Sequence, residues 1–397
     1  MQNLLRDWRS PTLLLMIMTA AMQLSFAVWW TVVKNFAVDD IGLTGADIGL
    51  QESIREIPGF MAFLAIYLVL FMRQQTLAVV SLLLLGGGVA ATGFFPTLTG
   101  LFVTTFLMSL GFHYFATMSD ALQLQWLPKA TAPAIMGRIV AVAAGAQLAA
   151  YGIIFVTWHT LNLTYQIVFG VAGGVTLVIT AFAMLAFPQY NVGPAQGKSP
   201  VLRRRYWLYY ALTFFSGARR QIFVVFAILL MVQRFEYDVE HVALLFLING
   251  ALNLVFAPVI GRMIVRWGER RALTLEYVGL VLLFIAYAFV SDPIVAAVLF
   301  IIDHAFFAMA IAMKTYFQKI ADPADIAPTA GVAFTINHIA AVFIPALFGL
   351  LWLVSPSAVF LSGAAMAACS LVLARMVPEA PEPGNEVIRQ LARQPAE

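Results

Sequence analysis

The chain has 397 residues, of which 62% are hydrophobic and only 11% are charged, and its mean hydropathy is +0.89. A soluble domain of this length needs many more charged side chains on its surface, so composition excludes one and predicts a polytopic membrane protein. The formal net charge of +3 comes from basic residues that alternate with apolar runs, a pattern that argues against a nucleic-acid partner.

Twelve apolar runs are long enough to cross a bilayer, because about 20 helical residues span its core of about 30 Å. None shows strand alternation, and a helix satisfies its own backbone groups in lipid, so the predicted fold class is all-α. The first run lacks a small-residue cleavage site, which predicts a spanning helix and not a signal peptide. The runs are 12–33, 53–72, 76–95, 97–122, 139–158, 165–187, 207–232, 242–265, 272–290, 294–317, 331–353 and 358–376.

The runs divide into two pseudo-symmetric six-helix bundles. We expect the first bundle at 1–190, a basic connector at 191–205, the second bundle at 206–377 and a tail at 378–397. The second half faintly repeats the first, since FATMSDALQLQWLPKATAPAIMGRIVA follows the fourth run and FAMAIAMKTYFQKIADPADIAPTAGVAFT follows the tenth. Internal repeats recur in secondary transporters, whose cargo site lies near the midplane between the repeats.

Basic residues between the runs predict the orientation. With the N-terminus inside, nearly all of them fall on the cytoplasmic side, and only Lys34 and Arg234 fall outside. This asymmetry supports the count of helices and predicts that both termini are cytoplasmic. The expected location is the bacterial cytoplasmic (inner) membrane.

One loop carries a recognisable motif, GRMIVRWGERRAL, after the eighth run. It resembles the loop signature of the major facilitator superfamily, which recurs there between helices 2 and 3 and between helices 8 and 9. Here Val265 stands where the family has an acidic residue, and the first copy of the motif is reduced to YLVLFMRQQTLA. Because the acidic partner is missing, Arg266 and Arg270 are expected to contact a helix C-terminus or a membrane lipid phosphate. The resemblance implies a monomeric secondary transporter that moves a small-molecule substrate by alternating access. The implied gating-loop residues are Gly261, Arg266, Gly268, Arg270 and Arg271.

Polar side chains inside the runs are the candidates for function, because a charge in hydrocarbon costs roughly 2.5–3.5 kcal/mol unless it is paired or hydrated. Arg219 and Arg220 lie roughly 20 Å along the seventh helix, too deep for easy snorkelling. Their guanidinium groups suit carboxylate, phosphate or sulfate, which predicts an anionic or zwitterionic cargo, and Asp303 is the expected partner of one of them. The predicted substrate-binding residues are Arg219, Arg220, Arg55, Lys314, Gln23, Asn249, Asn253 and His338.

Titratable side chains in the same runs are candidates for carrying a coupling proton. His113 and His304 hold near-equivalent places in the two repeats, and histidine titrates near physiological pH. A buried aspartate can also exchange a proton when desolvation outweighs its pairing with arginine. The predicted proton-coupling residues are Asp303, His304, His113, Asp120 and Glu56.

Several of these candidates have a purely structural alternative. Glu52, Arg55 and Glu56 lie at helical spacings and can form a local ion pair that only closes the structure. Asn249 and Asn253 share a helix face and can simply hydrogen-bond to a neighbouring helix. The histidines, likewise, can hydrogen-bond across the bundle.

Three classes of function remain open. The first is the transporter, which buried charges in both halves favour. The second is a transport-inactive relative that acts as an assembly factor or sensor. The third is a lipid-handling enzyme with His113, Asp303 and His304 as acid–base residues. No GxxxxGK, HExxH or GxSxG motif is present, and Cys369 is the single cysteine, so we expect no catalytic residues, no cofactor and no metal site.

Overall fold

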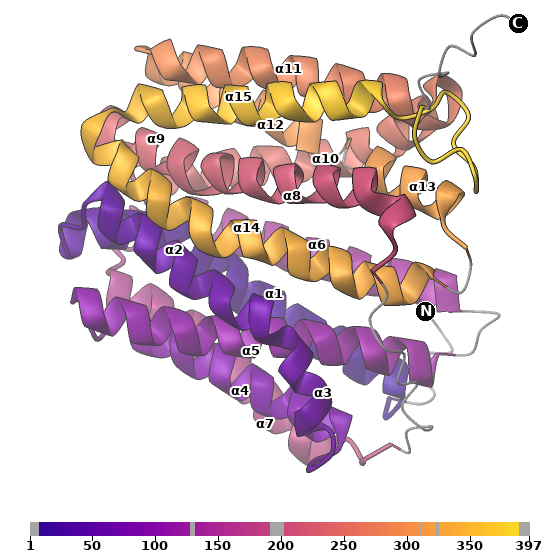
Figure 1. Cartoon of the computed structure of the whole chain (residues 1–397). Coiled ribbons are helices and arrows are strands. Elements are labelled where there is room, and N and C mark those ends of the chain that lie inside the picture. The colour runs from indigo at the N-terminus through magenta and orange to yellow at the C-terminus, as the bar shows by residue number, and fades with distance from the viewer. Residues whose placement is uncertain are drawn as a thin grey trace, which may run out of the picture. The chain divides into compact units, whose positions relative to one another are not determined.

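The computed structural model describes residues 8–127, 132–190, 202–307, 309, 311–322 and 325–388. Eleven helices in this part are long and apolar enough to cross a membrane (Figure 1). The described residues contain no strand, only an isolated bridge between Glu382 and Asn385. The predicted fold class of an all-α, multi-pass membrane protein is therefore confirmed.

The chain forms two compact units. The first comprises the described residues of Met1–Gln196, Ile228–Gly250 and Pro345–Leu350, and the second those of Gly197–Ala227, Ala251–Ile344 and Leu351–Glu397. Helices α10 and α14 each contribute to both units. The division into bundles at residues 190 and 206 stays a prediction.

Several helices of the first unit begin at a side chain that caps them. Ser10 accepts a hydrogen bond from the Leu13 amide at 3.3 Å, with Pro11 at the first helical position, and Thr97 and Thr164 cap later helices in the same way. The helices are α1 (Pro11–Asn35), α2 (Gly45–Phe60), α3 (Ala65–Leu68), α4 (Gln74–Thr92), α5 (Leu98–Trp126), α6 (Ala132–Thr157), α7 (Tyr165–Ala186) and α9 (Ile228–Phe235). A π-helical turn, η1 (Phe36–Asp40), extends α1.

The second predicted span, 53–72, is not one continuous helix, and that expectation was wrong. A capping box between Thr44 and Asp47 starts α2 well before the apolar run. Pro58 lies inside α2, which ends at Phe60 and passes through a 3-10 turn, η2 (Met61–Leu64), into the short α3. Proline removes a backbone donor and bends a helix, which accounts for the break.

Glycines allow close approach between helices of the first unit. Helix α4 packs along both α5 and α7. At Gly111 of α5, an added Cβ would collide with the Ser81 carbonyl oxygen and the Leu85 amide of α4. Small residues at such contacts let backbones approach, which is how membrane helices gain packing energy without a hydrophobic driving force.

We expect Gly111→Ala to destabilise the protein by about 1–3 kcal/mol, because the new methyl group overpacks this contact. Thermal unfolding of the purified protein in detergent measures the change. Gly87→Ala in α4 is the matched control, since nothing lies within 4 Å of a Cβ added there and alanine favours a helix by up to about 1 kcal/mol. Equal effects of the two substitutions would contradict the packing explanation.

The second unit contains the remaining long helices. Helix α15 packs against α8 and α11, and α11 also contacts α12 and α13. The predicted tenth span, 294–317, corresponds to two helices, α12 and α13. The helices are α8 (Trp207–Gln221), α10 (Val239–Trp267), α11 (Glu269–Phe289), α12 (Pro293–Phe307), α13 (Ile311–Ile320), α14 (Ile326–Val354) and α15 (Pro356–Arg375). A π-helical turn, η4 (Ile222–Ala227), follows α8.

The end of the predicted connector is held by acids of the second unit. Arg203 donates to both carboxylate oxygens of Asp325, at 2.6 and 2.9 Å, and these bonds hold the pKa of Asp325 below its usual value. Arg205 pairs with Asp322. The earlier connector residues 191–201, which include Lys198, lie outside the described residues. So do the tail residues 389–397.

The first part of the tail folds against the second unit. The hydroxyl of Tyr316 on α13 donates to the Glu386 carbonyl oxygen at 2.6 Å. Nη1 of Arg270 lies 3.6 Å from Oε1 of Glu379. The Ile388 amide donates to the Met376 carbonyl oxygen at 2.9 Å, which closes the tail into a loop.

Candidate functional site

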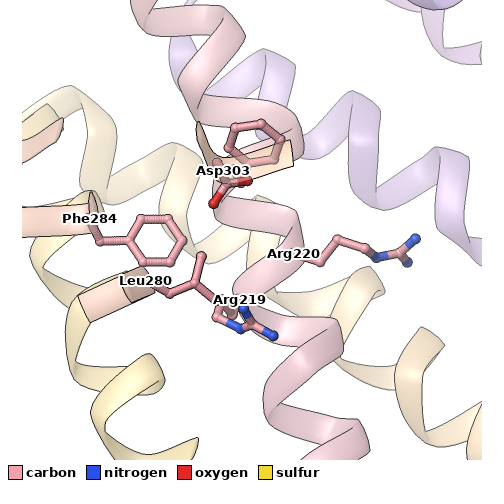
Figure 2. A pocket seen from close by; sticks show the side chains of 6 residues that line it. Arg219, Arg220, Leu280, Phe284 and Asp303 are labelled. Atoms are coloured by element: carbon pink, nitrogen blue, oxygen red, sulfur yellow. The ribbon is translucent and has the colours of Figure 1, made fainter. Parts of the chain in front are cut away.

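The paired arginines of the seventh span lie at a small cavity in the second unit. Arg219 and Arg220 occupy the last turn of α8, next to the π-helical turn η4. The cavity has a volume of about 10 Å³, which is the room that a single water needs. We call it the arginine cavity, and its lining residues are Arg219, Arg220, Phe223, Leu280, Phe284 and Asp303 (Figure 2).

Arg219 is committed to an ion pair that sequence reasoning missed. Its Nη2 donates to Oε1 of Glu276 on α11 at 3.0 Å, and both side chains are buried. Its guanidinium carbon also lies 5.1 Å from the ring centroid of Tyr277. Asp303 was the expected partner by depth, but no ion pair between Arg219 and Asp303 is found in the described structure. The sequence did hold a signal for Glu276, because it is the one carboxylate in the apolar run 272–290.

Asp303 of α12 is the second carboxylate at this place. Only 2% of its surface is exposed, and its Oδ1 has no hydrogen-bond partner among the described residues. Oε2 of Glu276 likewise has no hydrogen-bond partner among the described residues. Burial of a carboxylate oxygen without a donor is costly unless water or a proton satisfies it, so two acids beside one committed guanidinium form a site suited to holding a proton.

Arg220 points away from this pair. Figure 2 shows the two arginine side chains leaving α8 in different directions, as expected for consecutive residues about 100° apart. Its Nη2 donates to Oδ1 of Asn337 on α14 at 3.1 Å, and its side chain is only half-buried. Arg220 is therefore less buried than Arg219.

The histidines of the second unit are held by their own helices. Nδ1 of His304 donates to the Phe300 carbonyl oxygen at 3.2 Å, and the ring lies 5.1 Å from Phe223 of η4. Nδ1 of His338 on α14 donates to the Phe334 carbonyl oxygen at 2.8 Å. His304 thus contacts Phe223, a residue that lines the arginine cavity.

The first unit holds a separate group of buried charges, the α1–α2 ion-pair network of Lys34, Glu52, Arg55 and Glu56. Nε of Arg55 donates to Oε2 of Glu52 at 2.6 Å, Arg55 also pairs with Glu56, and Lys34 pairs with Glu52. The local ion pair that the spacing allowed is thus present. Two cations and two anions balance, so the network buries no net charge.

The predicted first span ends at residue 33, but helix α1 continues to Asn35 and includes Lys34. Only 1% of its surface is exposed. Helical structure continues through η1 to Asp40 and carries Lys34 inside, next to Gln51 and Glu52 of α2. A buried lysine is tolerated where a carboxylate faces it.

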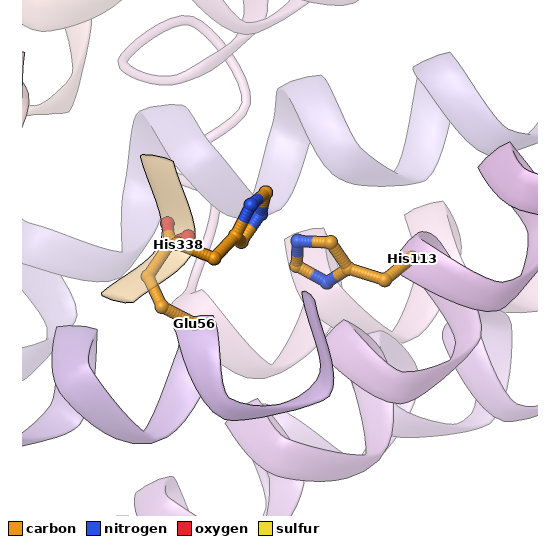
Figure 3. A group of neighbouring side chains, drawn as sticks. All are labelled: Glu56, His113 and His338. Atoms are coloured by element: carbon orange, nitrogen blue, oxygen red, sulfur yellow. The ribbon is translucent and has the colours of Figure 1, made fainter. Parts of the chain in front are cut away.

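Glu56 and His113 approach each other within the first unit. An oxygen of Glu56 on α2 and a ring nitrogen of His113 on α5 lie within 4.8 Å (Figure 3). Nδ1 of His113 also contacts Ser109, whose hydroxyl donates to the Arg55 carbonyl oxygen. His338, drawn in the same figure, belongs to the second unit. A titratable pair thus adjoins the ion-pair network.

Comparison with known proteins adds the family. A family model described as the Major Facilitator Superfamily matches residues 15–345. The chain belongs to the major facilitator superfamily. It is accordingly a secondary transporter rather than an enzyme, which removes support from the lipid-handling alternative. No curated protein sequence matches the chain significantly.

Solved structures share the fold of this superfamily member. A mutant form of the nucleoside transporter NupG matches with a TM-score of 0.78 and 15% identity, covering 92% of this chain and 99% of its own. The peptide transporter POT in complex with sulfate matches with a TM-score of 0.71 and 13% identity, covering 92% of each chain. A bacterial homologue of the human lysosomal transporter Spinster has a TM-score of 0.68 at 14% identity, covering 92% and 95%. At these identities the likeness concerns the fold alone.

The loop signature of the superfamily forms a tight turn between two helices here. Helix α10 ends at Trp267, and Gly268 has φ 79°, a conformation that favours glycine, before α11 begins. Arg270 faces Glu379 of the tail, while Arg266 and Arg271 are exposed. The turn accounts for the second glycine of the motif. The first, Gly261, lies inside α10 with open space around it.

The other predicted residues of this transporter are scattered. Lys314, Asp120 and Asn253 are exposed and belong neither to the arginine cavity nor to the ion-pair network. Asn249 is buried, and neither polar atom of its side chain has a hydrogen-bond partner among the described residues. Gln23 is half-buried on α1. The roles assigned to all of these residues stay predictions.

Proposed function

We propose that this transporter carries a small anionic or zwitterionic solute by alternating access and couples its movement to protons. One observation carries the proposal: the half-buried Arg220 and the buried Asp303 line the same water-sized cavity. The guanidinium is a forked donor suited to the carboxylate or phosphate of a cargo. The buried acids beside it supply a place for a proton.

The two charges have separate roles in this proposal. Arg219 is neutralised by Glu276 and positions α8 against α11. Arg220 binds the anionic group of the cargo, because it is only half-buried, whereas Arg219 is buried and paired with Glu276. Asp303 takes up and releases the coupling proton, with a water in the arginine cavity as its route. His304, His113, Asp120 and Glu56 are the further candidates for proton transfer.

The ion-pair network serves a structural role in this scheme. Arg55, first considered as a cargo ligand, has its donors directed at Glu52 and Glu56. An anion that displaced either acid would leave a buried carboxylate without its partner, which is costly. Arg55 therefore balances the two acids of α2, and the cargo anion binds at Arg220.

The basic segment that includes the end of α10 and the start of α11 contacts lipid in this proposal. Arg262, Arg266 and Arg271 are exposed, and Trp267 between them is an aromatic residue of the kind that lies at a membrane interface. Each arginine near an anionic membrane surface contributes about 1 kcal/mol. We place this loop and both termini on the cytoplasmic side of a bacterial inner membrane, with the chain acting as a monomer.

Flux through proteoliposomes tests the proposal. Vesicles holding the purified protein are given an inward proton gradient and screened against carboxylates, phosphates and amino acids. We expect Arg220→Ala to lower the initial uptake rate of the accepted anion at least about tenfold, because a charge-assisted contact with the cargo is worth about 2–5 kcal/mol. Arg262→Ala, at an exposed arginine outside the cavity, is the matched control and should keep wild-type uptake.

The opposite results would be decisive as well. If no anion or zwitterion moves while a partner protein co-purifies in fixed ratio, the transport-inactive alternative holds. If Arg220→Ala transports as the wild type does, the cargo does not bind at this arginine.

A further inference from the structure

A polar cavity in the first unit lies at the ends of two helices. Its volume is about 570 Å³, within the range of about 300–1,000 Å³ that is typical of small-molecule sites. One part of its lining comes from the end of α1 and from η1, and the other from α9 and the turn that follows it. We call it the acidic cavity. Its polar lining residues are Asn35, Asp39, Gln233, Glu236, Tyr237 and Asp238.

The acidic cavity carries negative charge without a basic partner. Asp238 is held by two histidines, since Nε2 of His159 lies 2.8 Å from its Oδ2 and Nδ1 of His241 lies 2.6 Å from its Oδ1. Asp39 instead accepts a hydrogen bond from a neutral tyrosine hydroxyl at 2.6 Å. Neither Asp39 nor Glu236 takes part in an ion pair within the described residues, and both are exposed. Two carboxylates at this cavity therefore lack a counter-charge.

A buried amide adds a hydrogen-bond acceptor to the lining of this cavity. Only 1% of the Asn35 surface is exposed, and its Nδ2 donates to the Tyr237 carbonyl oxygen at 2.7 Å. Its Oδ1 has no hydrogen-bond partner among the described residues. The cavity also lies at two helix C-termini, since η1 ends at Asp40 and α9 at Phe235, and the helix dipole places partial negative charge there. These groups together favour a ligand that donates hydrogen bonds and is positively charged.

The spacing of the acids favours an organic cation over a metal ion. A metal ion needs its ligand atoms close together. The carboxylates of Asp39, Glu236 and Asp238 do not form a group whose oxygens all lie within 4.8 Å of one another. Two ammonium groups joined by a short alkyl chain, by contrast, can each reach a separate carboxylate.

We propose that the acidic cavity binds an organic dication of the alkyl diamine class, with one ammonium group at Asp39 and the other at Glu236. This site goes beyond the proposed transport, because it belongs to the first unit, whereas Arg220 belongs to the second. In the orientation proposed above, the end of the first span lies outside the cytoplasm, so the diamine comes from that side. A bound diamine joins the end of η1 to the turn after α9 and stabilises the folded protein by mass action.

The backbone of Glu236 allows a variant that separates binding from folding. This residue follows α9 with φ 55°, a left-handed conformation that glycine adopts without strain. Glu236→Gly should therefore keep or raise the melting temperature of the ligand-free protein while it weakens binding of a diamine. If Glu236 served only the fold, the glycine variant would bind the diamine as the wild type does.

Calorimetric titration of the purified protein in detergent measures the binding of putrescine, with butanediol as an uncharged probe of the same length. We expect putrescine to bind and butanediol not to bind. Asp39→Asn, Glu236→Gln and Glu236→Gly should each weaken the binding of putrescine at least about fivefold, because each removes a hydrogen bond between charged groups. Glu382→Gln, at an exposed carboxylate of the tail, removes the same charge and should leave the affinity unchanged.

Two results would overturn the proposal. The first is that the wild type does not bind putrescine, or binds it no more tightly than the acid variants do. The second is that calcium chloride binds in place of putrescine and loses affinity in the same variants, which would assign the cavity to a metal ion. Because the titration requires no transport, its outcome does not depend on the cargo proposed at Arg220.

Discussion

Glu276→Gln is expected to destabilise the folded protein by about 3–5 kcal/mol, because it leaves Arg219 buried without its counter-charge. Only 1% of the Glu276 surface is exposed, and the pair closes at 3.0 Å inside the second unit. Arg219→Leu should cost a similar amount, since it strands the carboxylate beside Asp303. Reversible unfolding in detergent, followed by circular dichroism, measures both changes.

The double variant decides whether the pair itself is responsible. Replacing Arg219 and Glu276 together by leucine removes both charges, and such replacements are often neutral or stabilising. We expect the double variant to recover most of the stability that either single change loses. Strictly additive losses would mean that the two side chains act independently and that the ion pair is not what holds α8 to α11.

Asp303→Asn is expected to abolish concentrative uptake driven by a proton gradient, a loss of at least about tenfold. Asparagine has nearly the same shape but cannot release a proton, so the cargo site should survive. Exchange of labelled for unlabelled cargo across the vesicle membrane, which needs no net proton movement, should continue near the wild-type rate. The paired measurement separates loss of coupling from loss of binding.

His304 is the competing proton carrier, and His304→Gln is therefore measured alongside. If His304→Gln uncouples uptake while Asp303→Asn keeps its dependence on the pH gradient, the coupling proton resides on the histidine. If both variants respond to the gradient as the wild type does, neither residue next to the arginine cavity couples transport to protons.

Several local features of this fold could be predicted from the residues. The apolar runs gave the helices, because a segment of about 20 apolar residues has few stable alternatives in a bilayer. The loop motif placed a turn between two helices, and Gly268, the second glycine of the motif, has positive φ in the structure. The divergence of Arg219 and Arg220 followed from helical geometry alone.

Other features depended on which helix faces meet. Glu276 and Lys34 are buried partners of Arg219 and Glu52, yet Glu276 lies near the start of its apolar run and Lys34 just past the end of its own. The sequence shows how deep a charge lies in its own helix, but the partner depends on the rotation and tilt of a second helix. Pro58 gave a signal for the break in α2, but the early start at Thr44 required the capping box to be seen.

By itself, the sequence determined that this protein is an all-α membrane protein with charges buried in several spans, because hydrophobicity and helix length act within single segments. Only the tertiary structure decided how those charges pair, which arginine is the less buried, and that the rings of Phe26, Trp30 and Phe112 stack. The physical reason is that ion pairs and ring stacks need contact between atoms within a few ångströms. Spacing along one helix cannot fix how two separate helices pack against each other.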